Sequence, residues 1–319
     1  GDQALEVRLS GNNSGAGAPG LTVSENTLSS ASGTGIYVDE NTTGGGGANP
    51  RAAVITGNLI ANNRNQGVLI LAPQARWQVS QNSIFNNGTA AGGLGLDLGP
   101  TQSVTLNDSG DGDSGPNNLL NAPVFATAIR RGSDLVLSGF ARPGTAIELY
   151  IAAPDGTGFG EGQTYLTTLT EGSGADADGG TGTYSGTING LNQGTDNTNR
   201  FEFTIPLPGG TTTGTVLTAT GTLGGVTSEF AGNVVINIEP DAVDDVAFTP
   251  AGVAVSVNVT TNDTDSDGTI AAGTVDLDPS TPVREATFAT AAGTYTANAS
   301  GVVTYAPAAG YTGTAVLPY

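Results

Sequence analysis

Three nine-residue segments near the start of the chain align on their asparagines. They are LTVSENTLS (21–29), AVITGNLIA (53–61) and WQVSQNSIF (77–85). The alignment places Asn26, Asn58 and Asn82 in one column. Apolar residues fill two further columns, which are Val23 with Ile55 and Val79, and Leu28 with Ile60 and Ile84. Three columns kept in register predict a stack of similar coils, each of which covers the apolar face of its neighbour.

A second strand is expected in each repeat, directly after a glycine. The three segments are GIYV (35–38), GVLI (67–70) and GLDL (95–98). The period of two in a strand predicts that Tyr37, Leu69 and Asp97 face outward. The asparagines are 32 and then 24 positions apart, and the stretch GGGGANP (44–50) explains the difference as a loop insertion.

This pattern resembles the right-handed parallel β-helix, in which inward asparagines form a ladder at a bend. The resemblance implies that residues 1–120 are coils and a cap, and that they form the C-terminal part of a longer solenoid. A β-sandwich with asparagine-rich turns is the alternative. The columns in register across all three repeats favour the solenoid.

The end of a solenoid exposes apolar core and unpaired strand edges, so it needs a cover. In the segment 101–123, Val104 and Leu106 are expected in a final strand, and Leu119 and Leu120 are expected to plug the core. The loop between them carries three acids that could hold Ca²⁺. Tight turns require the same residue types, so the turn remains the alternative explanation. The three acids are Asp108, Asp111 and Asp113.

Residues 121–239 show about seven short strands separated by turn signals such as RPG (142–144) and PGG (208–210). This spacing predicts an immunoglobulin-like (Ig-like) β-sandwich. Stretches such as ARPGTAIELYIA resemble bacterial Ig-like modules appended to surface β-helix proteins. The polar segment 173–199 is expected to be a hairpin or a mobile loop, with Asp176 and Asp178 in solvent.

Residues 240–319 resemble the cadherin-like or bacterial Ig-like repeats of very large bacterial adhesins. The matching motifs are the opening Asp244–Asp245 pair, the loop NDTDSDG (262–268) and the ending VTYAPAAGYTG (303–313). Such modules run on past the final tyrosine, so the resemblance implies a sandwich that lacks its C-terminal strand. One hypothesis is that another subunit donates that strand, for example through ALEVRLS (4–10).

The loop 262–268 is the second candidate metal site. Its Asp-x-Asp-x-Asp-Gly spacing matches the start of a calcium loop, but the twelfth position is Thr274 where an EF-hand needs glutamate. Three close carboxylates repel one another without a cation. We therefore predict calcium as the cofactor of this loop. The expected ligands are Asn262, Asp263, Asp265 and Asp267, with Asp244 and Asp245 nearby.

Composition excludes several classes of function. The formal net charge of −20 argues against nucleic acid, because phosphate binding needs a basic patch. The chain has neither cysteine nor histidine, which removes disulfides, thiolate metal sites and histidine acid–base chemistry. Its apolar runs are too short to span a membrane. One tryptophan and eight tyrosines also give little stacking surface for a carbohydrate-binding module.

Parallel β-helices include polysaccharide lyases and hydrolases, whose chemistry needs paired acids or a strong base. The outward columns here carry no such stack; they are Ser24 with Thr56 and Ser80, and Tyr37 with Leu69 and Asp97. We therefore predict an extracellular structural or adhesive protein of the bacterial surface, a calcium-stabilised stalk or filament component without catalysis in this segment. Expected partners are neighbouring domains or subunits of the same protein, surface glycans or other cells. The alternative is the non-catalytic C-terminal portion of a secreted β-helix carbohydrate-active enzyme.

Overall fold

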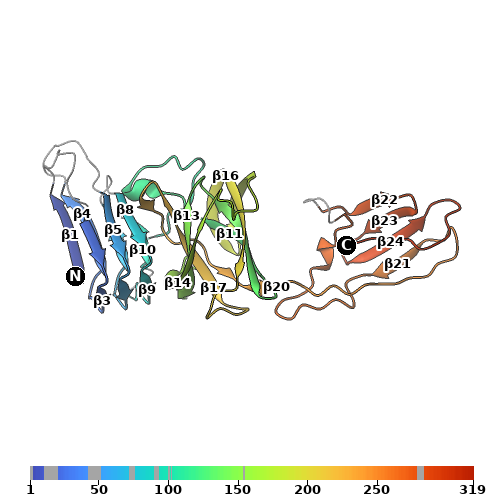
Figure 1. The fold of residues 1–319 in the computed structure, drawn as a ribbon, viewed down its shortest axis with the longest axis horizontal. Helices are drawn as coiled ribbons and strands as arrows, with labels where there is room; N and C mark the ends of the chain where they lie inside the picture. The colour runs from blue at the N-terminus through green and yellow to red at the C-terminus, as the bar shows by residue number, and fades with distance from the viewer. Residues whose placement is uncertain are drawn as a thin grey trace. The chain divides into compact units, whose positions relative to one another are not determined.

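The computed structural model describes residues 3–10, 21–41, 52–71, 76–89, 93–99, 101, 103–153, 155–278 and 284–319. These residues form strands, turns and two short 3-10 helices, and no α-helix occurs among them (Figure 1). The chain divides into two compact units, Gly1–Ile236 and Asn237–Tyr319.

The first unit begins with three parallel sheets. The first sheet has the order β1 (Leu5–Ser10), β4 (Ile36–Asn41), β7 (Val68–Ile70) and β10 (Leu96–Leu98). The second contains β2 (Leu21–Ser24), β5 (Ala52–Thr56) and β8 (Arg76–Ser80), and the third contains β3 (Thr27–Ser29), β6 (Leu59–Ala61) and β9 (Ser83–Phe85). Each coil contributes one strand to each sheet, so the predicted parallel β-helix is confirmed.

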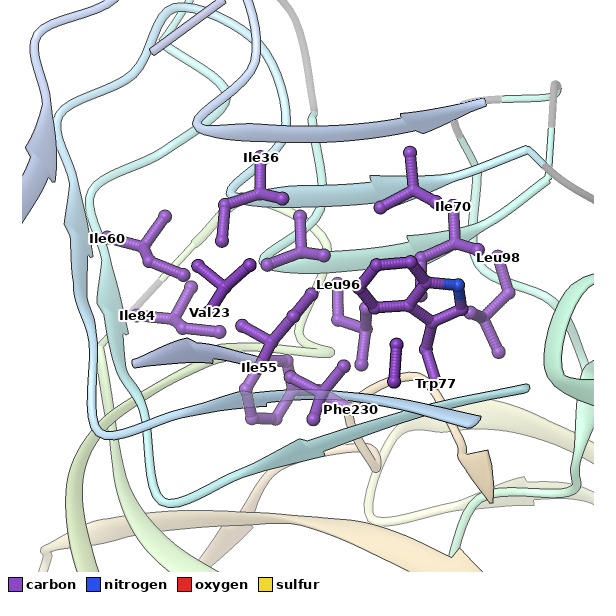
Figure 2. Packing of buried hydrophobic residues seen from close by; sticks show 14 of the residues in the cluster. Val23, Ile36, Ile55, Ile60, Ile70, Trp77, Ile84, Leu96, Leu98 and Phe230 are labelled. Atoms are coloured by element: carbon purple, nitrogen blue, oxygen red, sulfur yellow. The ribbon is translucent and has the colours of Figure 1, made fainter. Parts of the chain in front are cut away.

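The strand register matches the columns of the alignment. Val23 lies opposite Ile55, and Ile55 lies opposite Val79. The segment ALEVRLS falls in this architecture too, because its strand β1 pairs in register with β4 of the same chain. These inward apolar residues stack in the interior of the solenoid, around Ile36, Ile70 and Trp77 (Figure 2).

The asparagine ladder is confirmed by direct hydrogen bonds. Asn26 Nδ2 donates to Asn58 Oδ1 over 3.1 Å, and Asn58 Nδ2 donates to Asn82 Oδ1 over 2.9 Å. A second ladder, which the alignment did not reveal, joins Asn63 Nδ2 to Asn87 Oδ1 over 2.9 Å. The polar atoms of both ladders are satisfied, because the same side chains also bond to backbone groups at the bends.

The glycine before each β4-type strand is required by the close approach of the coils. A Cβ on Gly35 would lie 2.6 Å from the Gly67 carbonyl oxygen, and a Cβ on Gly67 would lie 2.5 Å from that of Gly95. These distances are far below ordinary van der Waals contact. The glycine column therefore fixes the spacing of successive coils at this corner.

The sandwich of the first unit consists of two antiparallel sheets. One contains β15 (Thr181–Ile188), β16 (Leu191–Pro206), β12 (Asp134–Ala141) and β11 (Val124–Arg131). The other contains β14 (Glu161–Thr170), β13 (Ala146–Ala153), β17 (Val216–Leu223) and β18 (Val226–Thr227), with β19 (Val234–Val235) paired to β17. Phe125, Phe201 and Phe203 are the largest side chains buried between the sheets.

Much of the segment 173–199 is an ordered hairpin of β15 and β16. Its turn, Asn189–Gly190, has positive φ at both residues (52° and 78°), which is the geometry of the tight turn that joins twisted strands. Asp178 pairs with Arg200 over 2.9 Å, and Asp176 accepts hydrogen bonds from the backbone. These two acids therefore have protein partners, where solvent was expected.

The solenoid and the sandwich share one compact unit and one apolar cluster. Tyr150 and Phe230 come from the sandwich, but both pack into the core of the coils. The predicted border between residues 120 and 121 thus falls inside this unit, whereas the unit itself ends at Ile236.

The cover of the last coil differs from the expectation in one respect. The backbone at Val104 and Leu106 forms no strand, and Leu106 is exposed. A 3-10 helix, η1 (Pro116–Leu119), lies against β8 and β10 in its place. Leu119 packs on the solenoid core as predicted, and Leu120 is buried.

The second unit begins at β20 (Asn237–Ile238) and contains one four-stranded antiparallel sheet. The order is β21 (Val255–Asn258), β24 (Val302–Pro307), β23 (Gly293–Ala297) and β22 (Thr287–Thr290), and the 3-10 helix η2 (Ala272–Thr274) precedes β22. Leu277 and Tyr295 lie in its small core. Ala315, Leu317 and Tyr319 pack against this core without forming a ladder strand.

Replacing Asn58 by alanine is expected to destabilise the first unit by about 2 kcal/mol, because it removes the side-chain hydrogen bonds to the Val23 carbonyl and to Asn82 Oδ1 and leaves the Asn26 backbone amide without its acceptor. Urea unfolding followed by Trp77 fluorescence measures the change. The exposed Asn197, which lies on β16, provides the control, and its alanine variant should stay within about 0.5 kcal/mol of the parent. Equal stability of both variants would contradict a stabilising ladder.

Candidate functional site

The first predicted loop brings its three acids together. Asp108 accepts hydrogen bonds from Gly112 N over 3.2 Å, and Asp111 Oδ1 accepts from Asn121 N over 2.7 Å. Burial, and then the charges of Asp108 and Asp111, raise the pKa of Asp113 to about 6. Burial also raises the pKa of Asp111. The three acids are therefore close enough to influence one another's ionisation.

A fourth acid, Asp196 on β16, anchors this loop, and sequence reasoning missed it. Its carboxylate accepts from Gly110 N over 2.8 Å and from Asn121 Nδ2 over 3.1 Å. Arg142 Nη1 lies 3.2 Å from Asp196 Oδ2, and the Asp196 side chain is fully buried. Arg142 thus places a positive charge beside this group of acids.

The acids of the second loop, 262–268, act as turn-forming groups. Asp263 Oδ1 accepts from Val243 N over 2.8 Å, and Asp267 Oδ2 accepts from Ile238 N over 2.9 Å. Asp265 Oδ1 accepts from the two amides that follow it, those of Asp267 and Gly268. Asn262 Nδ2 donates to the carbonyls of Val243 and Asp244.

The sequence predicted that Asp244 and Asp245 lie near this loop, and the contacts of the Tyr319 hydroxyl show that they do. Tyr319 donates to Asp245 Oδ2 over 2.9 Å, and it also reaches the carbonyls of Val243 and Val259. Burial, and then the negative charges of Asp245, Asp263 and Asp244, raise the pKa of Tyr319. The loop and the opening acid pair therefore lie near each other in the second unit.

These acids do not form a preorganised metal centre. Among the described residues, no group of three or more acidic side chains is arranged so that it could hold a metal ion. In the loop 262–268, one oxygen of each acid already accepts a backbone hydrogen bond. Calcium binding at either loop stays a prediction.

A further set of acids, also missed by sequence reasoning, joins the sandwich to the last coil. We call this set of contacts the joint. Three glutamates of the sandwich accept hydrogen bonds from the backbone of the coil: Glu148 from Gln81 N (2.8 Å), Glu161 from Asn87 N (3.0 Å) and Glu229 from Leu98 N (2.9 Å). All three are buried, with exposed fractions of 5%, 1% and 4%.

Two neutral side chains complete the joint. Asn117 of η1 accepts from Trp77 N over 2.8 Å and donates to the carbonyls of Trp77 and Thr227. Thr227 Oγ1 accepts from Val79 N over 2.9 Å. Alternate amides of β8 and its turn, at positions 77, 79 and 81, therefore donate to side chains where another coil would supply carbonyl groups.

The outer face of the first sheet carries a hollow of about 280 Å³. Tyr37, Leu69 and Gln66 are among the residues that line it. The third residue of the predicted outward column, Asp97, is fully buried. Gln66 Nε2 donates to Asp97 Oδ2 over 3.1 Å, and Asp97 Oδ1 has no hydrogen-bond partner. Burial raises the pKa of Asp97 to about 6.

Comparison with known proteins identifies two parts of the chain. Residues 8–115 match the family model of a right handed beta helix region, and residues 237–319 match that of a bacterial Ig domain. The second match has the same bounds as the second compact unit. None of the curated proteins matches the chain.

The chain therefore combines a right-handed β-helix region with a bacterial Ig domain, as its sequence predicted. Bacterial Ig domains are typical of surface or extracellular proteins, and both parts are compatible with a surface or structural protein. The helices among the described residues are far shorter than a membrane span requires.

Replacing Arg142 by alanine should destabilise the first unit by about 3 kcal/mol, because it leaves the buried Asp196 charge without its cation. Denaturant unfolding of the full chain measures the loss. The matched control is Arg200→Ala, which breaks the exposed pair with Asp178 and should cost less than about 1 kcal/mol. A loss at Arg142 as small as that at Arg200 would show that Asp196 does not depend on the pair.

Proposed function

We propose that this chain is a structural or adhesive part of an extracellular protein of the bacterial surface, where it serves as a stalk or filament component. The observation that carries the proposal is the joint. A shared apolar cluster and five capping side chains hold the sandwich on the last coil, so the β-helix and the sandwich act as one mechanical body. Such a connection suits a protein that transmits force between modules.

The chemistry of the described acids supports a role without catalysis in this segment. The buried glutamates bond to backbone amides of the last coil, and Asp196 is paired with Arg142. Glycoside hydrolysis needs two accessible carboxyl groups on either side of one bond. The joint glutamates are too deeply buried for that role.

The hollow beside Tyr37 and Gln66 favours a second candidate function. Tyrosine, amide and leucine side chains around a concave surface suit a hydroxyl-rich ligand such as a glycan segment. In this candidate the chain is the non-catalytic C-terminal portion of a secreted carbohydrate-active enzyme. Glycan recognition would then be the task of the solenoid face.

Immunogold electron microscopy of intact source cells, with antibodies against residues 1–319, tests the leading proposal. We expect label on surface appendages or on the outer surface, because a stalk or filament component must be accessible from outside. Label confined to the cytoplasm would contradict it. Release of the antigen into the medium together with polysaccharide-cleaving activity would favour the second candidate.

We also propose that Ca²⁺ stabilises the second unit through the loop 262–268. The support is electrostatic: residues 237–319 contain ten acids and one arginine, and Asp244, Asp245 and Asp263 all act on the Tyr319 hydroxyl. Each loop acid also has a second carboxylate oxygen that could turn toward an ion. Extracellular modules bind Ca²⁺ with Kd values of about 10⁻⁴ to 10⁻³ M.

Calcium at about tenfold above Kd should add about 1.4 kcal/mol to the stability of the second unit. Calorimetry of the parent should show a higher Tm in calcium, which EDTA reverses. The double variant Asp263→Ala/Asp265→Ala should lose this response, whereas the matched control Asp276→Ala/Asp278→Ala should keep it. The prediction fails if the parent and the loop variant melt alike with and without calcium.

A further inference from the structure

The joint is rich in buried carboxyl groups and lacks cations among its described contacts. Glu229 accepts from Leu98 N, Thr105 N and Thr105 Oγ1 over 2.8 to 3.1 Å. The acid that faces it from β10 is Asp97, whose charge acts on Glu229. Within the described residues, the ion pairs of Arg142 with Asp196 and of Arg200 with Asp178 lie outside the joint.

The neighbours of the other two glutamates are also neutral or acidic. Glu148 bonds to the hydroxyl groups of Ser80 and Tyr150, and to Gln81 N. Glu161 bonds to Asn87 N, and the charged group that acts on it is Asp155. Ionised carboxylates here are thus stabilised by dipoles alone, in surroundings that penalise charge.

Asp97 adds a second independent sign of strain. It is fully buried beside Gln66, and one of its oxygens has no hydrogen-bond partner. Two buried acids that act on each other cannot both ionise cheaply, so a proton on either Asp97 or Glu229 relieves the repulsion between them.

We propose that the joint is a proton-sensitive clasp between the last coil and the sandwich, closed while its buried carboxyl groups hold protons and loosened as they ionise. The titrating groups of the clasp are Glu161, Glu229 and Asp97. The clasp operates within the first unit and does not depend on the proposed surface location.

The direction of the pH effect follows from linkage. Burial raises the pKa of Glu229 to about 7 and that of Asp97 to about 6, and it also raises the pKa of Glu161. A carboxyl group with a raised folded-state pKa stabilises the fold below its unfolded value, and this contribution is lost as the pH rises through the folded value. The clasp therefore loosens between about pH 4 and pH 7, and it stays loose above that interval.

The only tryptophan of the chain reports on the clasp directly. Trp77 is fully buried in the last coil, and its backbone amide donates to Asn117 of the joint. Acrylamide quenching of its fluorescence therefore measures opening at this place. We expect quenching of the full chain to increase from pH 5 to pH 8.5 with a midpoint between about 6 and 7, while the fold remains intact by circular dichroism.

Asp97→Asn is the sharpest variant, because asparagine keeps the shape and can still accept from Gln66. The variant removes the Asp97 charge that opposes ionisation of Glu229. It should therefore reduce the increase in quenching and move the midpoint to lower pH. The matched control is Glu202→Gln, an exposed acid on β16 that should leave the profile unchanged.

A measurement on the parent chain covers the case in which the variant does not fold. Hydrogen exchange at the Leu98 amide, corrected for the intrinsic pH dependence, should accelerate as the pH rises. The expected factor is about tenfold for each unit by which folding raises the pKa of the clasp carboxyl group, whereas exchange at Ile60 should change less. Flat quenching and flat corrected exchange across this pH range overturn the proposal. An Asp97→Asn profile identical to that of the parent overturns it as well.

Discussion

The backbone amides at the open edge of the last coil determine how the first unit is built. Inside the solenoid, each strand donates to and accepts from its neighbours, and the asparagine ladders satisfy the bends. At the last coil the next strand is absent, and buried amides without partners would each cost about 1–3 kcal/mol. Side chains of η1 and the sandwich take the place of the missing carbonyl groups. The sandwich therefore supplies hydrogen-bond acceptors to the last coil of the solenoid, in addition to packing against it.

This substitution explains why glutamates were recruited to a buried surface. A coil offers carbonyl oxygens along a continuous line, whereas a sandwich meets the coil at only a few points. Glutamate reaches farther than a backbone carbonyl, and its oxygens can serve two donors, as Glu229 does for Leu98 and Thr105. A glutamate at this position buries a carboxyl group, and burial disfavours its ionised form. The contact therefore responds to protons.

Features that repeat along the sequence could be predicted, because an alignment of the repeats places equivalent residues in one column. The columns of Asn26, Val23 and Leu28 gave the coils and their register correctly. The second ladder was missed, although Asn63 and Asn87 are also 24 positions apart, because the alignment ended before them. The expected strand at Val104 and Leu106 was wrong, since η1 and the sandwich cover the coil and leave no edge there for another strand to pair with.

The joint itself had no sequence signal of this kind. Its bonds connect residues far apart in the chain, such as Val79 with Thr227 and Leu98 with Glu229, which are separated by 148 and 131 positions. Glu148, Glu161 and Glu229 lie in different strands and loops, so no local pattern relates them. Their strands could be predicted, but the meeting of those strands with the last coil is set by tertiary packing.

The aspartate motifs show the opposite relation between pattern and structure. Spacing in NDTDSDG was easy to recognise, yet Asp265 binds the amides of Asp267 and Gly268 as an ordinary turn residue does. A cation at this loop competes with those hydrogen bonds and gains chiefly by relieving repulsion among acids, so its effect on stability is small. The joint has no such freedom, because its carboxyl groups replace backbone partners that the fold needs. In the two proposals, protons at the joint therefore act on the packing of the first unit, whereas Ca²⁺ at the loop 262–268 would act on a turn of the second.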